Sequence, residues 1–144
     1  MPDKFDNFVV QLQQKIIKED IKDHSEKIVK LFYNPKNWGK PLKEEITLFE
    51  ERRGGQKGYL LGLYLKIVDN KIIKANFITD GCGAMVATAS QTTILIEGKS
   101  LKFAKNLKPE DIETSLEGLY KDEKHYTDYV LEILRGIIEK YKQN

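Results

Sequence analysis

The side chains with the most reactive chemistry in this sequence are one cysteine, Cys82, and two histidines, His24 and His125. A cysteine thiolate binds soft metals and attacks sulfur and carbon electrophiles, and a neutral imidazole is a common metal ligand. Because the chain has a single cysteine, it forms no internal disulfide and no site made of several of its own thiolates. Thiol chemistry therefore depends on Cys82 alone, or on Cys82 shared between chains.

Cys82 lies between Gly81 and Gly83, directly before a run of small residues over 84–90. We expect a helix to begin here, and the free backbone N–H groups and the dipole at a helix N-terminus favour a thiolate. Asp80 either opposes this effect through its charge or caps the helix. The alternative is a small buried cysteine that packs in the core and has no chemical role.

Acidic residues near the candidate ligands extend the chemistry to harder metals. His125 is expected in the first turn of the last helix, where it is a metal ligand or else an exposed or capping histidine. The carboxylates of Asp80, Asp122, Glu123 and Asp128 are candidate oxygen ligands for zinc or ferrous iron.

Arg52, Arg53 and Lys57 surround two glycines in a segment that we expect to be a flexible loop over 52–58. Such a loop is either solvated surface or a contact for a phosphate or a partner, because glycine lets the backbone approach an anion. It lacks the lysine and Ser/Thr pattern of a P-loop, which argues against nucleotide hydrolysis. Lys57 is also a candidate neighbour of Cys82 that would stabilise its thiolate in place of a metal.

The composition is that of a globular protein without a strong electrostatic preference. The 144 residues, 40% hydrophobic and 32% charged, suit one domain with an apolar core. A formal net charge of +2 gives no general attraction to nucleic acid or to an anionic membrane. No Ser/His/Asp spacing is typical of a hydrolase, so we do not expect an enzyme.

No stretch reaches the about 18 to 20 apolar residues that a membrane helix needs. The segment 1–6 is polar and lacks the apolar core of a secretion signal. With one free thiol and no export signal, the expected location is the cytoplasm.

The elements that must position these side chains begin with helices. Apolar residues recur at three- and four-residue steps across 5–17 and again across 28–32, which predicts two amphipathic helices. Pro35 and Pro41 interrupt this pattern, so 34–41 is expected to be a loop.

The middle of the chain alternates in polarity and is rich in strand-forming residues. This predicts a short strand around 46–50, a longer strand over 59–68 and a partner strand over 71–79, with a turn at Asp69 and Asn70. Consecutive strands with short connections indicate an antiparallel sheet.

Helices return after the strands. A helix of small residues from 84 is expected to lie centrally against the sheet and to end near Gly98. Ser100 is expected to cap a short helix and Pro109 to begin another, and apolar spacing over 126–141 predicts the last helix. This order predicts an α+β fold, a three-stranded antiparallel sheet packed against helices.

These elements carry sequence blocks that resemble the iron–sulfur cluster scaffold family, IscU and the N-terminal domain of NifU. The blocks are 25–29 with 33–37, 77–84 around the Gly-Cys-Gly motif, 87–90, and 98–101. The resemblance covers about 22 to 142 of a single domain over 1–144, and it leaves 1–21 as an additional N-terminal helix. It implies the SufE/NifU-like architecture.

The resemblance also implies a ligand set, of which this chain keeps a part. Family scaffolds hold a cluster or zinc with three cysteines, an aspartate and a histidine, and Cys82 and His125 correspond to the second cysteine and the histidine. The first cysteine falls near Lys57, the aspartate near Tyr59 and the third cysteine on Tyr126. Two ligands from one chain do not close the four-ligand site of an iron–sulfur cluster.

The stretch that the family's dedicated Hsp70 chaperone recognises falls on 119–123, where Leu119 alone matches. Docking to that chaperone is therefore not expected.

Three functions remain open on the sequence. The first is an iron–sulfur cluster assembly scaffold-like protein, in which Cys82 and His125 of two chains hold one cluster, or a zinc or iron ion, in a homodimer. The second is a single-thiol acceptor that keeps the fold without metal and takes sulfur from a cysteine desulfurase. The third is a small-molecule- or partner-binding domain in which Cys82 is structural. The resemblance favours the first, with other iron–sulfur assembly proteins as partners.

Overall fold

The protein has an α+β fold, seen here in a computed structural model that describes residues 23–143. The helix predicted over 5–17 lies outside the described residues. The order of elements is α2 (Glu26–Tyr33), η1 (Lys43–Glu45), β1 (Leu48–Gly54), β2 (Tyr59–Val68), β3 (Lys71–Thr79), α3 (Gly83–Ile96), α4 (Leu101–Lys105), α5 (Pro109–Ser115), η2 (Lys121–Glu123) and α6 (His125–Gln143). Of the described helices, none is long and apolar enough to cross a membrane.

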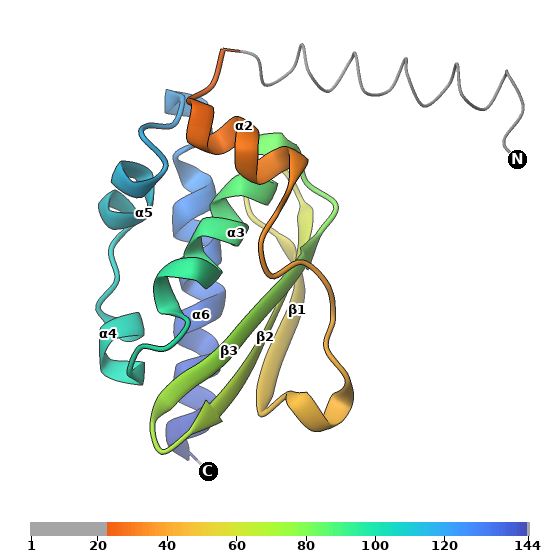
Figure 1. The fold of residues 1–144 in the computed structure, drawn as a ribbon, viewed down its shortest axis with the longest axis vertical. Helices are drawn as coiled ribbons and strands as arrows, with labels where there is room; N and C mark the ends of the chain where they lie inside the picture. The colour runs from red at the N-terminus through yellow and green to blue at the C-terminus, as the bar shows by residue number, and fades with distance from the viewer. Residues whose placement is uncertain (1–22, 144) are drawn as a thin grey trace, which may run out of the picture.

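The strands form the predicted three-stranded antiparallel sheet, in the order β1-β2-β3. Leu63 in the middle of β2 pairs with Glu50 of β1 and with Phe77 of β3. The long helices gather on one face of this sheet (Figure 1). The fold predicted from the order of elements is therefore confirmed.

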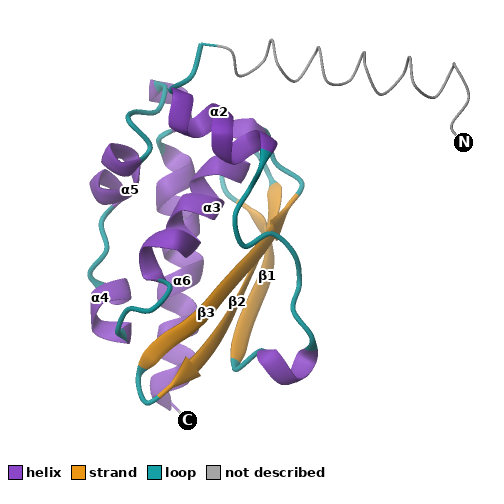
Figure 2. Ribbon diagram, in the orientation of Figure 1, coloured by secondary structure: helices purple, strands orange, loops and turns teal. Residues whose placement is uncertain are grey.

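Alternation along the strands explains why one face attracts the helices. Leu61, Leu63 and Leu65 point the same way from β2 and are each at most 1% exposed. On the other face of β1, Phe49 and Glu51 are exposed, and η1 lies on that side of the sheet (Figure 2). The core therefore lies between the sheet and the helices. A buried side chain of a helix can contact the sheet only on this face.

Helix α3 is the centre of this core, as its small side chains predicted. Every residue of α3 is buried except Ile94 and Leu95. Two of its buried hydroxyl groups donate within the helix, Thr88 to the carbonyl of Ala84 at 2.7 Å and Thr92 to the carbonyl of Thr88 at 2.8 Å. Because small residues bring backbones close together, α3 packs against both β3 and α2.

The helix ends show the capping chemistry that was predicted at Ser100 and Gly98, and Ser25 adds a cap that was not predicted. Ser25 Oγ accepts a hydrogen bond from Ile28 N at 3.1 Å at the start of α2, and Ser100 Oγ accepts from Phe103 N at 3.0 Å at the start of α4. Gly98 follows α3 with φ of +82°, a left-handed conformation that glycine adopts without strain.

The loop after α2 protects an edge of the sheet. Gly39 N donates to Phe77 O at 2.8 Å, and Phe77 N donates to Asn37 O at 3.0 Å, so this loop continues the hydrogen bonding beyond β3. The Trp38 ring packs edge-on against Phe77, with 5.2 Å between ring centroids. The predicted loop over 34–41 is therefore an ordered cover for β3.

The prediction of a flexible loop over 52–58 is wrong for the first half of that segment. Arg52 and Arg53 belong to β1, which continues to Gly54. The Arg52 guanidinium donates to Glu50 at 3.1 Å and to Glu132 of α6 at 3.0 Å. Backbone pairing with β2, in which Arg52 lies opposite Leu61 and Arg53 opposite Leu60, makes this segment a strand although its glycines and charges indicated a loop.

Phe77→Ala should reduce the free energy of unfolding by about 3–5 kcal/mol, because Phe77 is completely buried between the sheet and the helices. The matched control is Ile73→Ala on the same strand, where the native side chain is 44% exposed and the expected loss is below about 1 kcal/mol. Urea unfolding followed by circular dichroism measures both. Equal losses for the two variants would contradict the assignment of the core face.

Candidate functional site

Cys82 connects the end of β3 to the start of α3, at the predicted helix N-terminus. It is the N-cap residue, and its carbonyl accepts the hydrogen bond from Val86 N at 3.0 Å that begins the helix. Its side chain makes no capping hydrogen bond and is half-buried. The thiol therefore faces a partner on another element.

That partner is Tyr126 of α6, whose Oη lies 3.2 Å from Sγ of Cys82. The Tyr126 side chain is buried, with 3% exposure. Burial, and after it the hydrogen bond with Cys82, raise the pKa of the Tyr126 phenol well above its usual range. The phenol thus stays protonated and can donate its hydrogen bond to a thiolate.

A second tyrosine, Tyr59 at the start of β2, extends this contact. A hydrogen bond with Tyr59 adds to the rise in the pKa of Tyr126, and the two ring centroids are 6.0 Å apart. Gly81 allows this close packing, because a Cβ there would lie 2.9 Å from Cδ2 of Tyr59 and 2.6 Å from Cγ of Met85. Sequence reasoning had placed Tyr59 and Tyr126 at family ligand positions but had not predicted their hydrogen bonds.

His125 is beside this group and begins α6, as predicted. Its ring lies edge-on to the Tyr126 ring, with 4.4 Å between centroids. The Nε2 atom of His125 is buried and has no hydrogen-bond partner among residues 23–143. Cys82 and His125, the two predicted ligands, thus both contact Tyr126, while no hydrogen bond between the two is found in the described part of the chain.

Asp80 does not cap α3, which corrects one of the two roles considered for it. Its carboxylate accepts hydrogen bonds from Leu60 N and from the Arg53 guanidinium, both at 2.8 Å. The backbone hydrogen bond from Leu60, followed by the one from Arg53, lowers the pKa of Asp80 below its usual range. Its charge is therefore compensated by Arg53, which reduces its repulsion of a thiolate at Cys82.

The other predicted neighbours of the site do not assemble around it. In the described part of the chain, Lys57 forms no hydrogen bond or ion pair with Cys82. Nor do three His, Cys, Asp or Glu side chains gather into a metal-binding group within 23–143, so the expected oxygen ligands Asp122, Glu123 and Asp128 form no such site.

Glu123 is instead paired with His24, a pairing that the sequence did not predict. The His24 Nε2 atom is 2.8 Å from Oε2 of Glu123, and their side chains are 4% and 13% exposed. The His24 ring also lies against the Tyr120 ring in a tilted arrangement, with 4.3 Å between centroids. The partners are 99 positions apart, and no local sequence signal predicts such a pair.

The arrangement gives one thiol, one imidazole and two phenols. Thiolate and imidazole suit an iron–sulfur cluster or zinc, whereas a protonated phenol does not. The residues of one chain therefore do not fit a closed cluster site. They do place one neutral hydroxyl, that of Tyr126, 3.2 Å from the sulfur of Cys82.

Comparison with known proteins gives the family. The NifU-like N terminal domain family matches residues 23–144. The iron-sulfur cluster assembly scaffold protein IscU 1 of Archaeoglobus fulgidus is 30% identical over 122 residues, which cover 84% of this chain and 78% of that protein. IscU of Aquifex aeolicus is 31% identical over 121 residues, covering 83% and 76% of the two chains.

Solved structures show the same fold. A NifU-like N-terminal protein from Brucella abortus superposes with a TM-score of 0.66 at 17% identity, covering 89% of this chain and 99% of that one. A putative scaffold protein for the SUF system from Fervidobacterium islandicum gives a TM-score of 0.59 at 18% identity, covering 82% and 98%. From the family match and the relatives together, this chain belongs to the NifU-like N-terminal domain family.

Proposed function

We propose that this protein is a scaffold-like component of iron–sulfur cluster assembly whose reactive group is the Cys82 thiol. The observation that carries the proposal is the position of Cys82 at the start of α3, half-buried and 3.2 Å from the Tyr126 hydroxyl. The family and the names of its scaffold relatives support the assembly function. The role is to bind and pass on cargo in the cytoplasm, without catalytic turnover.

In the scaffold form of the proposal, two chains pool their ligands. Each chain contributes Cys82 and His125, so that a homodimer offers the four ligands that a cluster requires. The buried Nε2 atom of His125 supports this role, because it has no hydrogen-bond partner in residues 23–143. The cluster, or a single zinc or iron ion, is the cargo of such a dimer.

Anaerobic reconstitution with iron and sulfide should give the wild-type protein a visible iron–sulfur absorption and convert it to a dimer. Cys82→Ser should remove the absorption, and His125→Ala should weaken it, because each removes a ligand from both chains. Lys57→Ala is the control and should leave the spectrum unchanged. Absorption spectra with sedimentation velocity measure colour and mass together. A colourless wild type, or a coloured monomer, would rule out the shared site.

The hydrogen bond between Cys82 and Tyr126 favours a second function, a single-thiol sulfur acceptor. The Cys82 thiolate would attack the outer sulfur of a persulfide on a cysteine desulfurase. A new S–S bond forms at Cys82, the S–S bond of the donor breaks, and the donor cysteine leaves as its thiolate. The transfer needs no metal and no outside oxidant, and the Tyr126 phenol stabilises the attacking thiolate.

Incubation with a cysteine desulfurase and free cysteine should add the mass of one sulfur atom to Cys82. The added mass should be removed by a thiol reductant, because it is held by an S–S bond. Mass spectrometry of the intact protein and of its peptides locates the modification, with Cys82→Ser as the control. An unmodified Cys82 in the presence of an active desulfurase would exclude sulfur transfer. The scaffold form would then be tested by the iron and sulfide reconstitution alone.

Tyr126→Phe should slow the reaction of Cys82 with a thiol reagent near neutral pH by about tenfold, because a hydrogen bond to a charged group is lost. Tyr129→Phe is a matched control on the same helix, since its hydroxyl hydrogen-bonds to the backbone carbonyls of Arg52 at 2.9 Å and of Tyr59 at 3.1 Å rather than to the thiol. Stopped-flow absorbance gives both rates. A faster reaction in Tyr126→Phe would mean that the phenol shields the thiol instead of activating it.

A further inference from the structure

Helix α4 carries a surface that the Cys82 chemistry does not use. It lies beside the turn between β2 and β3, where Leu101 N donates to Asn70 O at 2.9 Å. Cys82 follows the opposite end of β3, so the two places are separated by the length of that strand (Figure 1). A ligand on α4 therefore leaves the thiol accessible.

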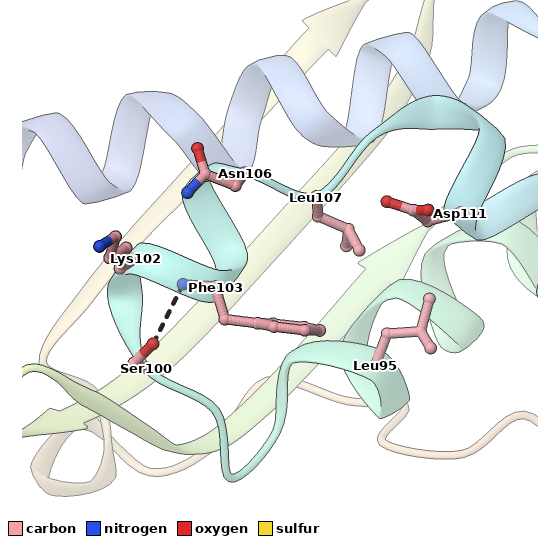
Figure 3. A pocket seen from close by; sticks show the side chains of 7 residues that line it. All are labelled: Leu95, Ser100, Lys102, Phe103, Asn106, Leu107 and Asp111. Atoms are coloured by element: carbon pink, nitrogen blue, oxygen red, sulfur yellow. Dashed lines mark hydrogen bonds between the residues drawn. The ribbon is translucent and has the colours of Figure 1, made fainter.

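One side of α4 is an apolar hollow between α3 and α4. Leu95, Phe103 and Leu107 form its floor, and Ser100, Lys102, Asn106 and Asp111 complete its lining (Figure 3). The Phe103 side chain is 43% exposed, and Ile94 beside Leu95 is 37% exposed. An exposed aromatic ring next to a hollow is a typical anchor point in protein interfaces.

The backbone that carries Phe103 is held in place by the surrounding structure. Ser100 caps its backbone N–H, and Leu101 and Ala104 on either side of it are buried. The segment before α4 is tied to the sheet, because Ile72 N donates to Lys99 O at 2.8 Å. A surface ordered before binding loses less conformational entropy when a partner docks.

The other side of α4 is strongly basic. A second hollow is lined by Lys102, Lys105 and Lys142 together with Asn70, Ser100, Leu101 and Asn106. Lys105 has one carboxylate nearby, Glu139 at 3.9 Å. Within the described residues, no carboxylate lies at ion-pair distance from Lys102 or Lys142.

The lysines at this hollow also lie close to one another, which adds to the excess of positive charge. A hydrogen bond with Lys105, and after it the positive charge of Lys105, lower the pKa of Lys142, while the charge of Glu139 partly opposes this effect. Lys99 adds another positive charge, 5.4 Å from the Phe103 ring centroid. Asp111, the acid in the first hollow, already accepts a hydrogen bond from Lys108 N at 2.9 Å. An acidic partner would relieve this repulsion.

We propose that the α4 surface, formed by Leu95, Phe103, Leu107, Lys102, Lys105 and Lys142, binds an acidic segment of a partner protein that carries an aromatic or aliphatic anchor. The anchor fills the apolar hollow and stacks on Phe103, while carboxylates on the same segment pair with the lysines. Charge complementarity selects acidic segments, and the hollow beside the lysines selects those that carry an apolar residue. A free phosphate would use the lysines and leave the hollow empty.

The experiment titrates the full chain with a short peptide of glutamates around a central Leu-Phe pair, followed by amide NMR shifts and by calorimetry. We expect shifts confined to residues 94–107 and to the end of α6 around Lys142. Lys102→Glu and Phe103→Ala should each weaken binding by about tenfold, because they remove a charge contact and the anchor contact. Lys43→Glu on η1 is the matched charge control and, like Cys82→Ser, should bind as the wild type does.

Two further probes separate this surface from a general attraction to anions. A peptide with alanines in place of the Leu-Phe pair should bind at least about tenfold more weakly, and inorganic phosphate should not reproduce the shifts at Leu95 and Leu107. The proposal is overturned if no shifts occur on α4, if Lys43→Glu weakens binding as much as Lys102→Glu, or if the alanine peptide binds equally. The last result would leave an anion site without an anchor.

Discussion

Helix α3 must be buried on nearly all sides, and the rest of the structure is arranged around that requirement. A helix surrounded by a sheet and other helices needs small side chains, and the polar ones among them need partners inside the protein. Thr88 and Thr92 bind carbonyls of their own helix, and Ser90 Oγ donates to Lys36 O at 2.9 Å. The Ser90 contact also holds the loop after α2, which in turn covers the edge of β3.

The position of the thiol is a consequence of the same packing. Because α3 is fixed between the sheet and α6, its first turn brings Cys82 against the beginning of α6, where Tyr126 and His125 lie. The pair of His24 and Glu123 joins the segment before α2 to η2, just ahead of α6. The environment of Cys82 is thus set by elements that are buried for reasons of stability, and its chemistry is set by which side chains these elements present.

The local pattern of apolar and polar residues was enough to predict much of the fold. Where the prediction failed, the failure has a physical cause. Alternation and helical spacing gave the sheet and the helices from α2 onward, and Ser100 and Gly98 gave helix ends. The local pattern failed at Arg52 and Arg53, because their backbone pairs with Leu61 and Leu60 of β2, a tertiary contact that local composition does not reveal.

The candidate site was predictable in position but not in its bonding. The Gly-Cys-Gly motif placed Cys82 before a helix, and the family resemblance placed Tyr126 and Tyr59 near it. No periodicity specifies that a phenol from one helix lies 3.2 Å from a thiol at the start of another. The pairing of His24 with Glu123 was missed for the same reason, because the spacing of residues along the chain does not indicate contacts between distant segments.

The dependence of Cys82 on α6 has a consequence for the order in which the protein is made. Synthesis proceeds from the N-terminus, so β3, Cys82 and α3 leave the ribosome before Tyr126 does. Until α6 has emerged, the thiol has no phenol beside it and α3 lacks part of its cover. The nascent chain therefore passes through a stage in which its single cysteine lacks the Tyr126 hydrogen bond, and that bond forms only when α6 packs against α3.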